Sequence, residues 1–428
     1  MIYSIVNKLN EIKKFPYYFI SPLPYAIGNA SEQILIAAGK AKKFKKKLVI
    51  LNFNFFSKIL KYNICNLPLF DDLVIDGFSQ KKIKILKFIL MFFLEIEFFF
   101  RRVFILINDI FFKFEMKEVY RFPNIGFPDA FESESIKENN IHFKKFNDVK
   151  QFDINYKLVD LEERVKSECE NILNSFQIKK SDKIVCLHVR DGGYKKDYSR
   201  KSYRNSNINN YIKSIKYLIQ KGFWVIRLGD YPTKKTKFKN KKFIDIPYSK
   251  IKSQEMDLYL IQRSFFYIGT QSGTLDVAYM FNKPVLLTNM CEMFASRPRK
   301  KNDRGIFKKI FDKKKKKFIS IKKFINLPYK YHNPEIIIKD LKFIENSSEE
   351  IYLAVKEFLE NFNNKRKLTK SSLQIKFQKL LEKRFYEIFY ENDKTGKNML
   401  NHTDAIKMIR MVKSSRGYFC NSYLKKIF

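Results

Sequence analysis

The residues best placed to do chemistry follow a short apolar run near the middle of the chain. Residues 183–189 are mostly apolar and include His188 next to their end, and Arg190 follows at once. An Asp-Gly-Gly loop comes next at 191–193, and its two glycines can take the positive φ values of a tight turn. A buried strand that delivers an imidazole and a guanidinium at its carboxyl end places nitrogen donors where open α/β sheets bind their ligands.

Two further apolar runs end in residues that could contact the same ligand. Residues 223–228 predict a strand that ends at Gly229 and Asp230. Residues 264–268 predict another, followed by the segment 269–274 with the sequence Gly-Thr-Gln-Ser-Gly-Thr. If these strands are parallel, all three loops emerge at one edge of the sheet.

This combination suits a nucleoside diphosphate. Arg190 can form two hydrogen bonds to a diphosphate in a geometry that lysine cannot match. Backbone N–H groups and the hydroxyls of Ser272 and Thr274 would lie at the positive end of the following helix. A buried carboxylate such as Asp230 could accept a hydrogen bond from a base or ribose. The Ser-Gly turn alone is more often only a turn, and we find neither a nucleotide-binding glycine motif nor a D-x-D pair for a metal.

The elements that would position these strand ends alternate regularly along the chain. Helices are predicted at 208–221, 254–263 and 275–281, and further strands at 243–246 and 283–288. Such alternation is typical of a doubly wound parallel sheet with helices on both faces. A charged helix near 157–176 is expected to lead into this region.

A second β–α–β pattern lies near the start of the chain. Strands are predicted at 15–20 and 47–52, with a helix at 30–40 between them. Gly28 and Asn29 stand where the loop meets the helix, so that backbone N–H groups there could face a ligand. A plain tight turn is the usual alternative for a single Gly-Asn pair.

Residues 83–112 are the most apolar part of the chain, but charged residues interrupt them. A membrane-spanning helix needs about 20 mostly apolar residues, and the uncharged runs here are shorter. The segment therefore predicts one or two helices that are either buried in the core or lie at a membrane surface. A core helix is the commoner outcome for such a segment.

Composition restricts the partners and the compartment. The 428 residues carry a net charge of +40, which favours nucleic acid, an anionic membrane or a phosphorylated substrate as partner. The excess is mostly lysine and accompanies abundant Ile, Asn, Phe and Tyr, so compositional bias of the genome is an equal alternative. Five cysteines without C-x-x-C spacing argue against a disulfide framework or a zinc site and fit a reducing cytoplasm. The first residues lack the pattern of a secretory signal peptide.

These motifs resemble a known family. The sequence His-Val-Arg-Asp-Gly-Gly-Tyr at 188–194 is similar to the H-x-R motif of the fucosyltransferase-like glycosyltransferases, which have the GT-B fold. A group of predicted bacterial glycosyltransferases from lipopolysaccharide and capsule loci is a closer match. The segments similar to that group are 188–194, 203–211, 225–230, 265–273, 284–289 and 416–424. The resemblance covers roughly residues 15–55 and 181–295 and the last part of the chain.

The resemblance implies a fold and a reaction. It implies two Rossmann-like domains facing a cleft, an acceptor domain over 1–175 and a donor domain over 176–345, followed by C-terminal helices and a tail over 346–428. The implied reaction moves a sugar from a nucleotide-diphosphate sugar to a bacterial surface-polysaccharide or glycolipid acceptor. It implies neither a metal nor another cofactor.

The resemblance also assigns roles to residues. Arg190 would contact the donor diphosphate, and His188 would support the same region. Glu32 and Asp191 are candidates for the catalytic base by position only, since each type is more often a surface or capping carboxylate. The residues expected to bind the donor share a place on the loops at the strand ends: Gly28, Asn29, Tyr194, Arg204, Asn205, Gly229, Asp230, Thr270, Gln271, Ser272, Gly273 and Thr274.

Two other functions are alternatives to a glycosyltransferase. A basic nucleic-acid-binding protein without catalytic activity is the alternative suggested by the charge, but the basic residues are spread along the chain and form no recognised module. A nucleotide-sugar epimerase of related fold is disfavoured by the H-x-R motif. We expect a cytoplasmic protein whose basic, aromatic N-terminal half could contact the anionic inner face of the plasma membrane, where a lipid-linked acceptor would lie.

Overall fold

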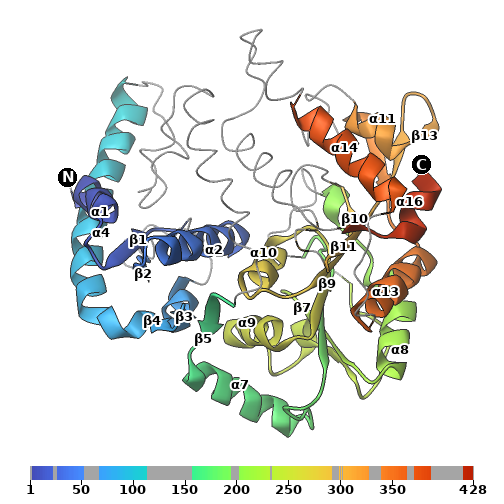
Figure 1. Ribbon diagram of the computed structural model, residues 1–428, viewed down its shortest axis with the longest axis horizontal. Helices are drawn as coiled ribbons and strands as arrows, with labels where there is room; N and C mark the ends of the chain where they lie inside the picture. The colour runs from blue at the N-terminus through green and yellow to red at the C-terminus, as the bar shows by residue number, and fades with distance from the viewer. Residues whose placement is uncertain are drawn as a thin grey trace. The chain divides into compact units, whose positions relative to one another are not determined.

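The chain forms two compact units (Figure 1). One contains Met1–Asn171 together with Tyr279–Asn282, and the other contains Ile172–Ala278 and Lys283–Phe428. The computed structural model describes residues 2–22, 27–52, 67–112, 157–193, 202–231, 234–291, 298, 300, 302–326, 339–363, 371–386 and 418–427.

A seven-stranded parallel sheet forms the centre of the C-terminal unit. Its strands are β6 (Ile184–His188), β7 (Trp224–Leu228), β8 (Phe243–Asp245), β9 (Phe266–Gly269), β10 (Val285–Met290), β11 (Arg304–Phe307) and β15 (Tyr418–Phe419). They lie in the order β15-β11-β10-β9-β6-β7-β8, and every neighbouring pair is parallel. The winding starts at β6, proceeds through β7 to β8, and then reverses to β9 on the other side. This is the order of a doubly wound sheet, and the predicted parallel α/β architecture is confirmed.

The strands are apolar almost throughout because helices cover a parallel sheet on both faces. All residues of β7 and β10 are buried. The connecting helices are α8 (Ile212–Gln220), α9 (Gln254–Arg263) and α10 (Gly273–Met280), and α8 follows a 3-10 turn, η8 (Ile208–Tyr211). The α9 helix begins where predicted because the Ser253 side chain accepts a hydrogen bond from the Met256 N–H at 3.0 Å.

The described part of the C-terminal unit also contains a small antiparallel sheet and four further helices. A small antiparallel sheet has the order β13-β12-β14, with β12 (Lys309–Asp312), β13 (Lys317–Ile319) and β14 (Leu341–Ile344). The helices are α11 (Ile321–Ile325), α13 (Ser348–Asn363), α14 (Ser372–Tyr386) and α16 (Asn421–Ile427).

The N-terminal unit contains the predicted β–α–β pattern. The strands β1 (Tyr17–Ile20) and β2 (Lys47–Ile50) are parallel, and α2 (Ile27–Lys43) connects them. The helix begins earlier than predicted, so that Gly28 and Asn29 lie in its first turn and not in the preceding loop. Because only this one crossover is described, a doubly wound sheet in this unit stays a prediction.

An antiparallel sheet with the order β4-β3-β5 completes the described strands of the N-terminal unit. Its strands are β3 (Leu73–Ile75), β4 (Phe78–Ser79) and β5 (Val159–Leu161). The helix expected over 157–176 is therefore wrong at its start, because Val159–Leu161 pairs with β3 and the helix α7 (Glu163–Ser175) begins only afterwards.

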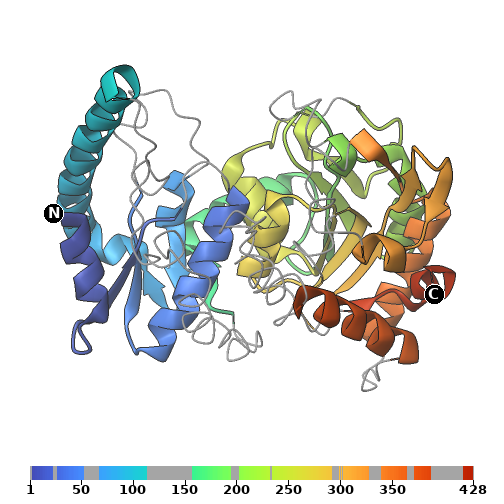
Figure 2. The same ribbon diagram turned by 90° about the horizontal axis from the view of Figure 1, so that it is seen from above.

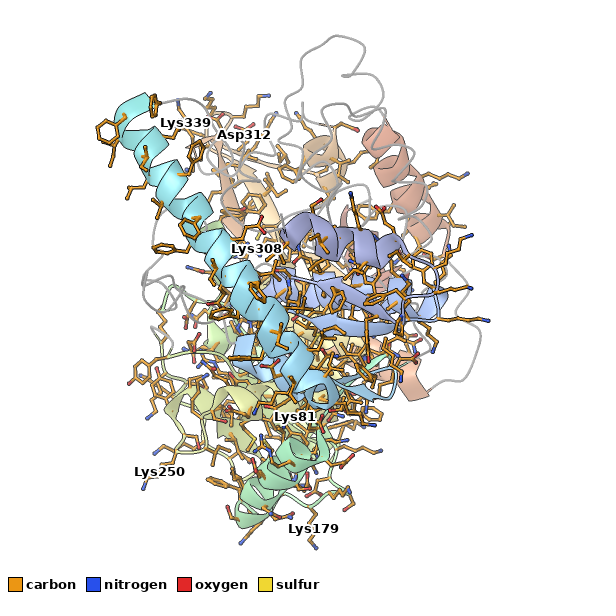
Figure 3. The ribbon with its side chains drawn as sticks, turned by 90° about the vertical axis from the view of Figure 1, so that its left-hand side faces the viewer. Lys81, Lys179, Lys250, Lys308, Asp312 and Lys339 are labelled. Carbon is orange, nitrogen blue, oxygen red and sulfur yellow. The ribbon has the colours of Figure 1, made fainter. Side chains whose placement is uncertain are left out.

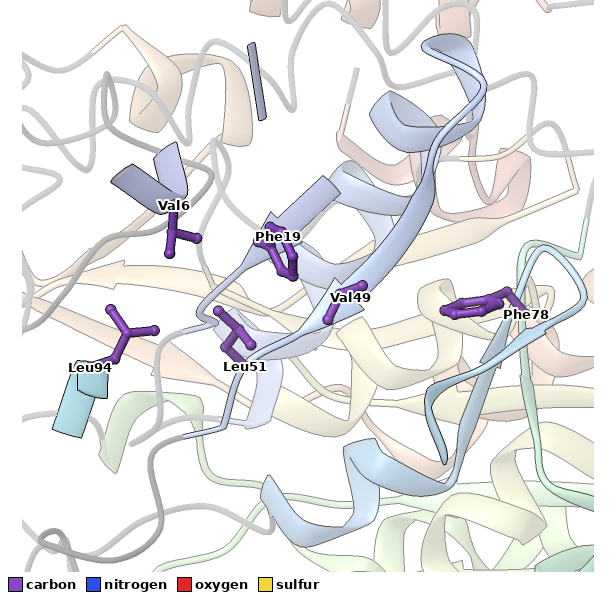
Figure 4. Close-up of a cluster of buried hydrophobic side chains, with 6 residues drawn as sticks. All are labelled: Val6, Phe19, Val49, Leu51, Phe78 and Leu94. Carbon is purple, nitrogen blue, oxygen red and sulfur yellow. The ribbon is translucent and has the colours of Figure 1, made fainter. Parts of the chain in front are cut away.

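Buried apolar side chains hold β1 and β2 against two helices, α1 (Ile2–Glu11) and α4 (Lys84–Ile107). The cluster consists of Val6, Phe19, Val49, Leu51, Phe78 and Leu94 (Figure 4). The apolar segment at 83–112 is thus one long helix, α4, followed by a π-helical turn at Asn108–Phe112. Figures 1 and 2 show α4 at the margin of the N-terminal unit. Among the described helices none is long and apolar enough to cross a membrane.

Gly269, the last residue of β9, has no room for a side chain. A Cβ atom there would lie 2.5 Å from Cε1 of the Tyr267 ring, which is itself buried. We expect Gly269→Ala to lower the free energy of unfolding by about 1–3 kcal/mol in urea denaturation, because a packed ring must move. The loss should be less than additive when it is combined with Tyr267→Ala. An additive loss would show that the ring is not the obstacle.

Candidate functional site

The ends of β6 and β9 lie side by side, as the sequence predicts. His188 is in register with Gly269, and the Thr270 N–H donates to the His188 carbonyl at 3.2 Å. One step further on, the Arg190 N–H donates to the Thr270 hydroxyl at 3.0 Å. The winding of the sheet reverses between these two strands, and open α/β sheets bind ligands at this point.

A chain of hydrogen-bonded hydroxyls connects the two strand ends. The Tyr267 hydroxyl lies 2.7 Å from Thr274 Oγ1, which lies 3.1 Å from Ser272 Oγ. Ser272 Oγ in turn lies 3.0 Å from His188 Nδ1. These contacts fix the Ser272 and Thr274 hydroxyls at the start of α10, where backbone N–H groups and the helix dipole favour an anion.

His188 is a neutral imidazole at physiological pH. Burial, and then the positive charges of Arg227 and Arg190, lower its pKa to about 3. A group with so low a pKa is a weak base near neutrality. Its neutral ring is held against Ser272 by a hydrogen bond, and the supporting role that the family resemblance implies for His188 stays a prediction.

Arg190 and Arg204 tie the loop after residue 201 to the strand ends. An Nη1 hydrogen of Arg190 is donated to the Asn205 side-chain oxygen, and the Arg190 carbonyl accepts from the Ser206 N–H at 2.9 Å. Arg204 donates from Nη2 to the Gln271 carbonyl at 2.5 Å. Two cationic side chains predicted from sequence are thus held at one sheet edge.

Lys308 adds a third cation that sequence reasoning missed. It directly follows β11, is almost fully buried, and donates from Nζ to the carbonyls of Tyr203 at 3.0 Å and Asn205 at 2.5 Å. Burial is the main cause that lowers its pKa, and the nearby Arg190 lowers it further. A buried lysine held by carbonyls favours an anion nearby. The signal available in the sequence was a lysine placed immediately after an apolar run.

Arg227 is a second residue whose importance the sequence reasoning missed. It is buried within β7 and lies 3.5 Å from Asp191 Oδ2 and 3.4 Å from Asp245 Oδ2. The other oxygen of Asp191 accepts from the Gly193 N–H at 3.0 Å. Asp191, a candidate base by position, is therefore engaged in holding the loop after β6. An arginine inside an apolar strand was the visible signal.

The strand end at β7 differs from the expectation of a buried carboxylate. The Asp230 side chain is 57% exposed and lies 3.5 Å from Lys252 Nζ. Between β7 and Asp230, Gly229 has a φ of +124°, a backbone conformation that favours glycine. Asp230 can still accept a hydrogen bond from a ligand, but only at a solvated position.

Three predicted donor-binding residues take up supporting positions. Thr270 and Gln271 are fully buried; the Thr270 hydroxyl accepts from Arg190 and the Gln271 side-chain oxygen accepts from the Cys291 N–H at 2.7 Å. Gly273 is the first residue of α10. The side chains of Thr270 and Gln271 are thus used in buried hydrogen bonds. Ser272 and Thr274 are the more accessible polar side chains of this loop.

The other predicted residues are not brought into this group. Gly28, Asn29 and Glu32 belong to the N-terminal unit, and Glu32 is almost fully buried there. Their grouping with the strand-end residues stays a prediction. Tyr194 lies outside the described residues. In the part of the chain that the structure describes, no three His, Cys, Asp or Glu side chains group as a metal site would require.

Comparison with known proteins gives partial structural matches. No family model matches the sequence, and the search of curated proteins finds no significant relative. A glycosyl transferase family 9 structure from Veillonella parvula matches 33% of this chain and 41% of its own, with 11% identity and a TM-score of 0.23. The dodecameric iron-containing heptosyltransferase TibC, in complex with ADP-D-beta-D-heptose, matches 25% of this chain and 27% of its own, with 18% identity and a TM-score of 0.18. This chain is thus distantly similar, over less than half of either protein, to glycosyltransferase structures.

The low pKa of His188 predicts a pH dependence of stability. The unfolded chain binds a proton at His188 below about pH 6.5 whereas the folded chain does not, so stability is lost as the pH falls from about 6.5 towards 3. The slope from this residue reaches at most about 1.4 kcal/mol per pH unit. His188→Asn, which keeps a hydrogen-bonding nitrogen near the Nδ1 position, should remove that part of the slope. The free energy of unfolding of wild type and His188→Asn would be measured by urea titration at several pH values in this range. Equal dependence on pH in the two proteins would contradict the assignment.

Proposed function

We propose that the protein is a glycosyltransferase whose nucleotide-diphosphate sugar donor binds at the carboxyl ends of β6 and β9. One observation carries this proposal: at the reversal point of a doubly wound parallel sheet, the Arg190 N–H binds the Thr270 hydroxyl and His188 binds the Ser272 hydroxyl, so that the two strand ends are joined there. This is the position where such sheets bind nucleotides. The resemblance of the H-x-R segment to fucosyltransferase-like enzymes supports the same reaction.

The charges at this edge suit a leaving diphosphate. Arg190 can offer two parallel N–H groups, and the first turn of α10 offers backbone N–H groups beside the Ser272 and Thr274 hydroxyls. When the bond from the sugar to the diphosphate breaks, negative charge grows on the diphosphate oxygen while positive charge grows on the sugar ring. Donors already fixed in place stabilise that growing negative charge without reorganising.

The acceptor and the base belong to the same proposal. We propose a bacterial surface polysaccharide or glycolipid as acceptor, in keeping with the loci of the proteins that this chain resembles. The acceptor hydroxyl must lose a proton when it attacks the sugar. His188 is a poor candidate for that proton because its pKa is about 3, and Asp191 is engaged by Arg227. Glu32 stays a candidate by its position in the sequence.

Arg190→Ala should weaken the binding of nucleoside diphosphates by about 10- to 100-fold, because the diphosphate loses a bidentate charged donor. Isothermal titration with a panel of nucleoside diphosphates would measure this, and Arg190→Lys should recover only part of the affinity. Arg164→Ala is the matched control, since Arg164 is an exposed arginine of α7 paired with Glu168 at 2.8 Å. Equal affinity in Arg190→Ala and Arg164→Ala would remove Arg190 from the site.

We also propose that transfer needs no metal, because the arginine and the helix start would carry out the charge stabilisation for which many transferases use a divalent cation. Nucleoside-diphosphate binding and donor turnover should then be the same in EDTA and in added Mg²⁺ or Mn²⁺. Binding that disappears in EDTA and returns with either cation would contradict this part of the proposal and leave the sugar transfer itself open.

A further inference from the structure

The long helix α4 exposes a continuous apolar face. Its exposed large apolar residues share one side of the helix: Ile85, Phe88, Ile89, Phe92, Phe93, Phe99, Phe100, Val103, Phe104, Leu106 and Ile107. Phe88 is 72% exposed and Phe100 is 66% exposed. Figure 3 shows α4 crossing the view with aromatic side chains projecting from it and with Lys81 near its start. A contiguous exposed patch of this size marks an interaction surface.

The pattern along the helix separates the two faces. The exposed residues recur at helical spacing, with the half-buried Ile96 in the interval between Phe93 and Phe99, which keeps them on one side of an α-helix. The buried residues Lys87, Leu94 and Phe98 lie on the opposite side, where Leu94 belongs to the core cluster. With 24 residues, α4 carries this face over about 36 Å. The expected core helix is therefore correct for one side only.

Charges on and around α4 favour an anionic partner. The two carboxylates of α4 are not exposed: Glu95 is only 6% exposed and Glu97 is half-buried. Lys82 and Lys84 are exposed at the beginning of the helix, and neither makes an ion pair with another described residue. Residues 1–112 together contain 17 Lys and Arg but only 8 Asp and Glu. An apolar face bordered by unpaired lysines is complementary to lipid chains beneath anionic head groups.

We propose that α4 lies in the surface of an anionic membrane, with its phenylalanine face among the lipid chains and the lysines at its start against the head groups. Phenylalanine, isoleucine and leucine side chains make up this face, and a lipid surface accommodates them without a complementary pocket. The charged interruptions that prevent α4 from spanning a membrane are compatible with an orientation in the plane. The inference rests on the N-terminal unit alone and does not depend on the proposed sugar transfer.

Vesicle flotation with the full chain tests this inference. Wild-type protein should float with vesicles of phosphatidylcholine and phosphatidylserine and bind much less to phosphatidylcholine alone. Phe88→Ser with Phe100→Ser should reduce binding to the mixed vesicles by about tenfold or more, since two large apolar side chains no longer enter the lipid. Lys82→Glu with Lys84→Glu should reduce binding to the mixed vesicles only.

The matched control is Phe176→Ser with Phe318→Ser, which removes two exposed phenylalanines from the C-terminal unit. This variant should bind vesicles like wild type. Thermal unfolding should be unchanged in all variants because the replaced side chains are exposed.

Equal vesicle binding by Phe88→Ser/Phe100→Ser and wild type, or equal binding of wild type to both vesicle types, overturns the proposal. The proposal is also overturned if the wild-type protein binds no vesicles and forms a dimer that Phe88→Ser/Phe100→Ser converts to a monomer. That result would assign the apolar face of α4 to a second copy of the chain.

Discussion

Parallel pairing of β6 with β9 is the constraint on which the candidate site depends. It brings Arg190 against Thr270, 80 residues further along the chain, through one hydrogen bond from the backbone of a loop to a side chain. The first loop contains two glycines, and the second leads directly into α10. The two strands lie on either side of the reversal in winding, which is the position where open α/β sheets bind their ligands.

Buried charges lie next to these strand ends. Arg227 is compensated by Asp191 and Asp245, and its remaining field helps to keep His188 neutral. Lys308 is held by backbone carbonyls. Arginine and hydroxyl side chains thus lie at this edge of the sheet, and the charge of Arg227 beneath them is paired with two carboxylates. Interactions between such buried charges are stronger than between solvated ones, since the local dielectric response is weaker.

The sequence predicts the strand ends well because they combine two strong local signals, an apolar run and a polar or glycine turn. It also predicts α9 and the parallel arrangement, since alternation of strands and helices leaves few topologies. It misses Lys308 and Arg227, whose roles depend on contacts with Tyr203, Asp191 and Asp245 that are distant in the chain. It also expects Asp230 to be buried, whereas the side chain is 57% exposed, because the burial of a residue just after a strand depends on tertiary packing that the local pattern does not reveal.

The positively charged residues at the start of α4 and near the strand ends form two groups that differ in their exposure to solvent. The lysines at the start of α4 are exposed, so their attraction to anionic head groups falls when salt screens it. The cations near the strand ends are partly or fully buried, so salt would screen their attraction to the proposed diphosphate much less. Compositional bias and function stay alternative explanations for the abundance of lysine over the whole chain. Positions 190, 204 and 227 carry arginine, whose planar fork of donors can make paired hydrogen bonds that lysine cannot.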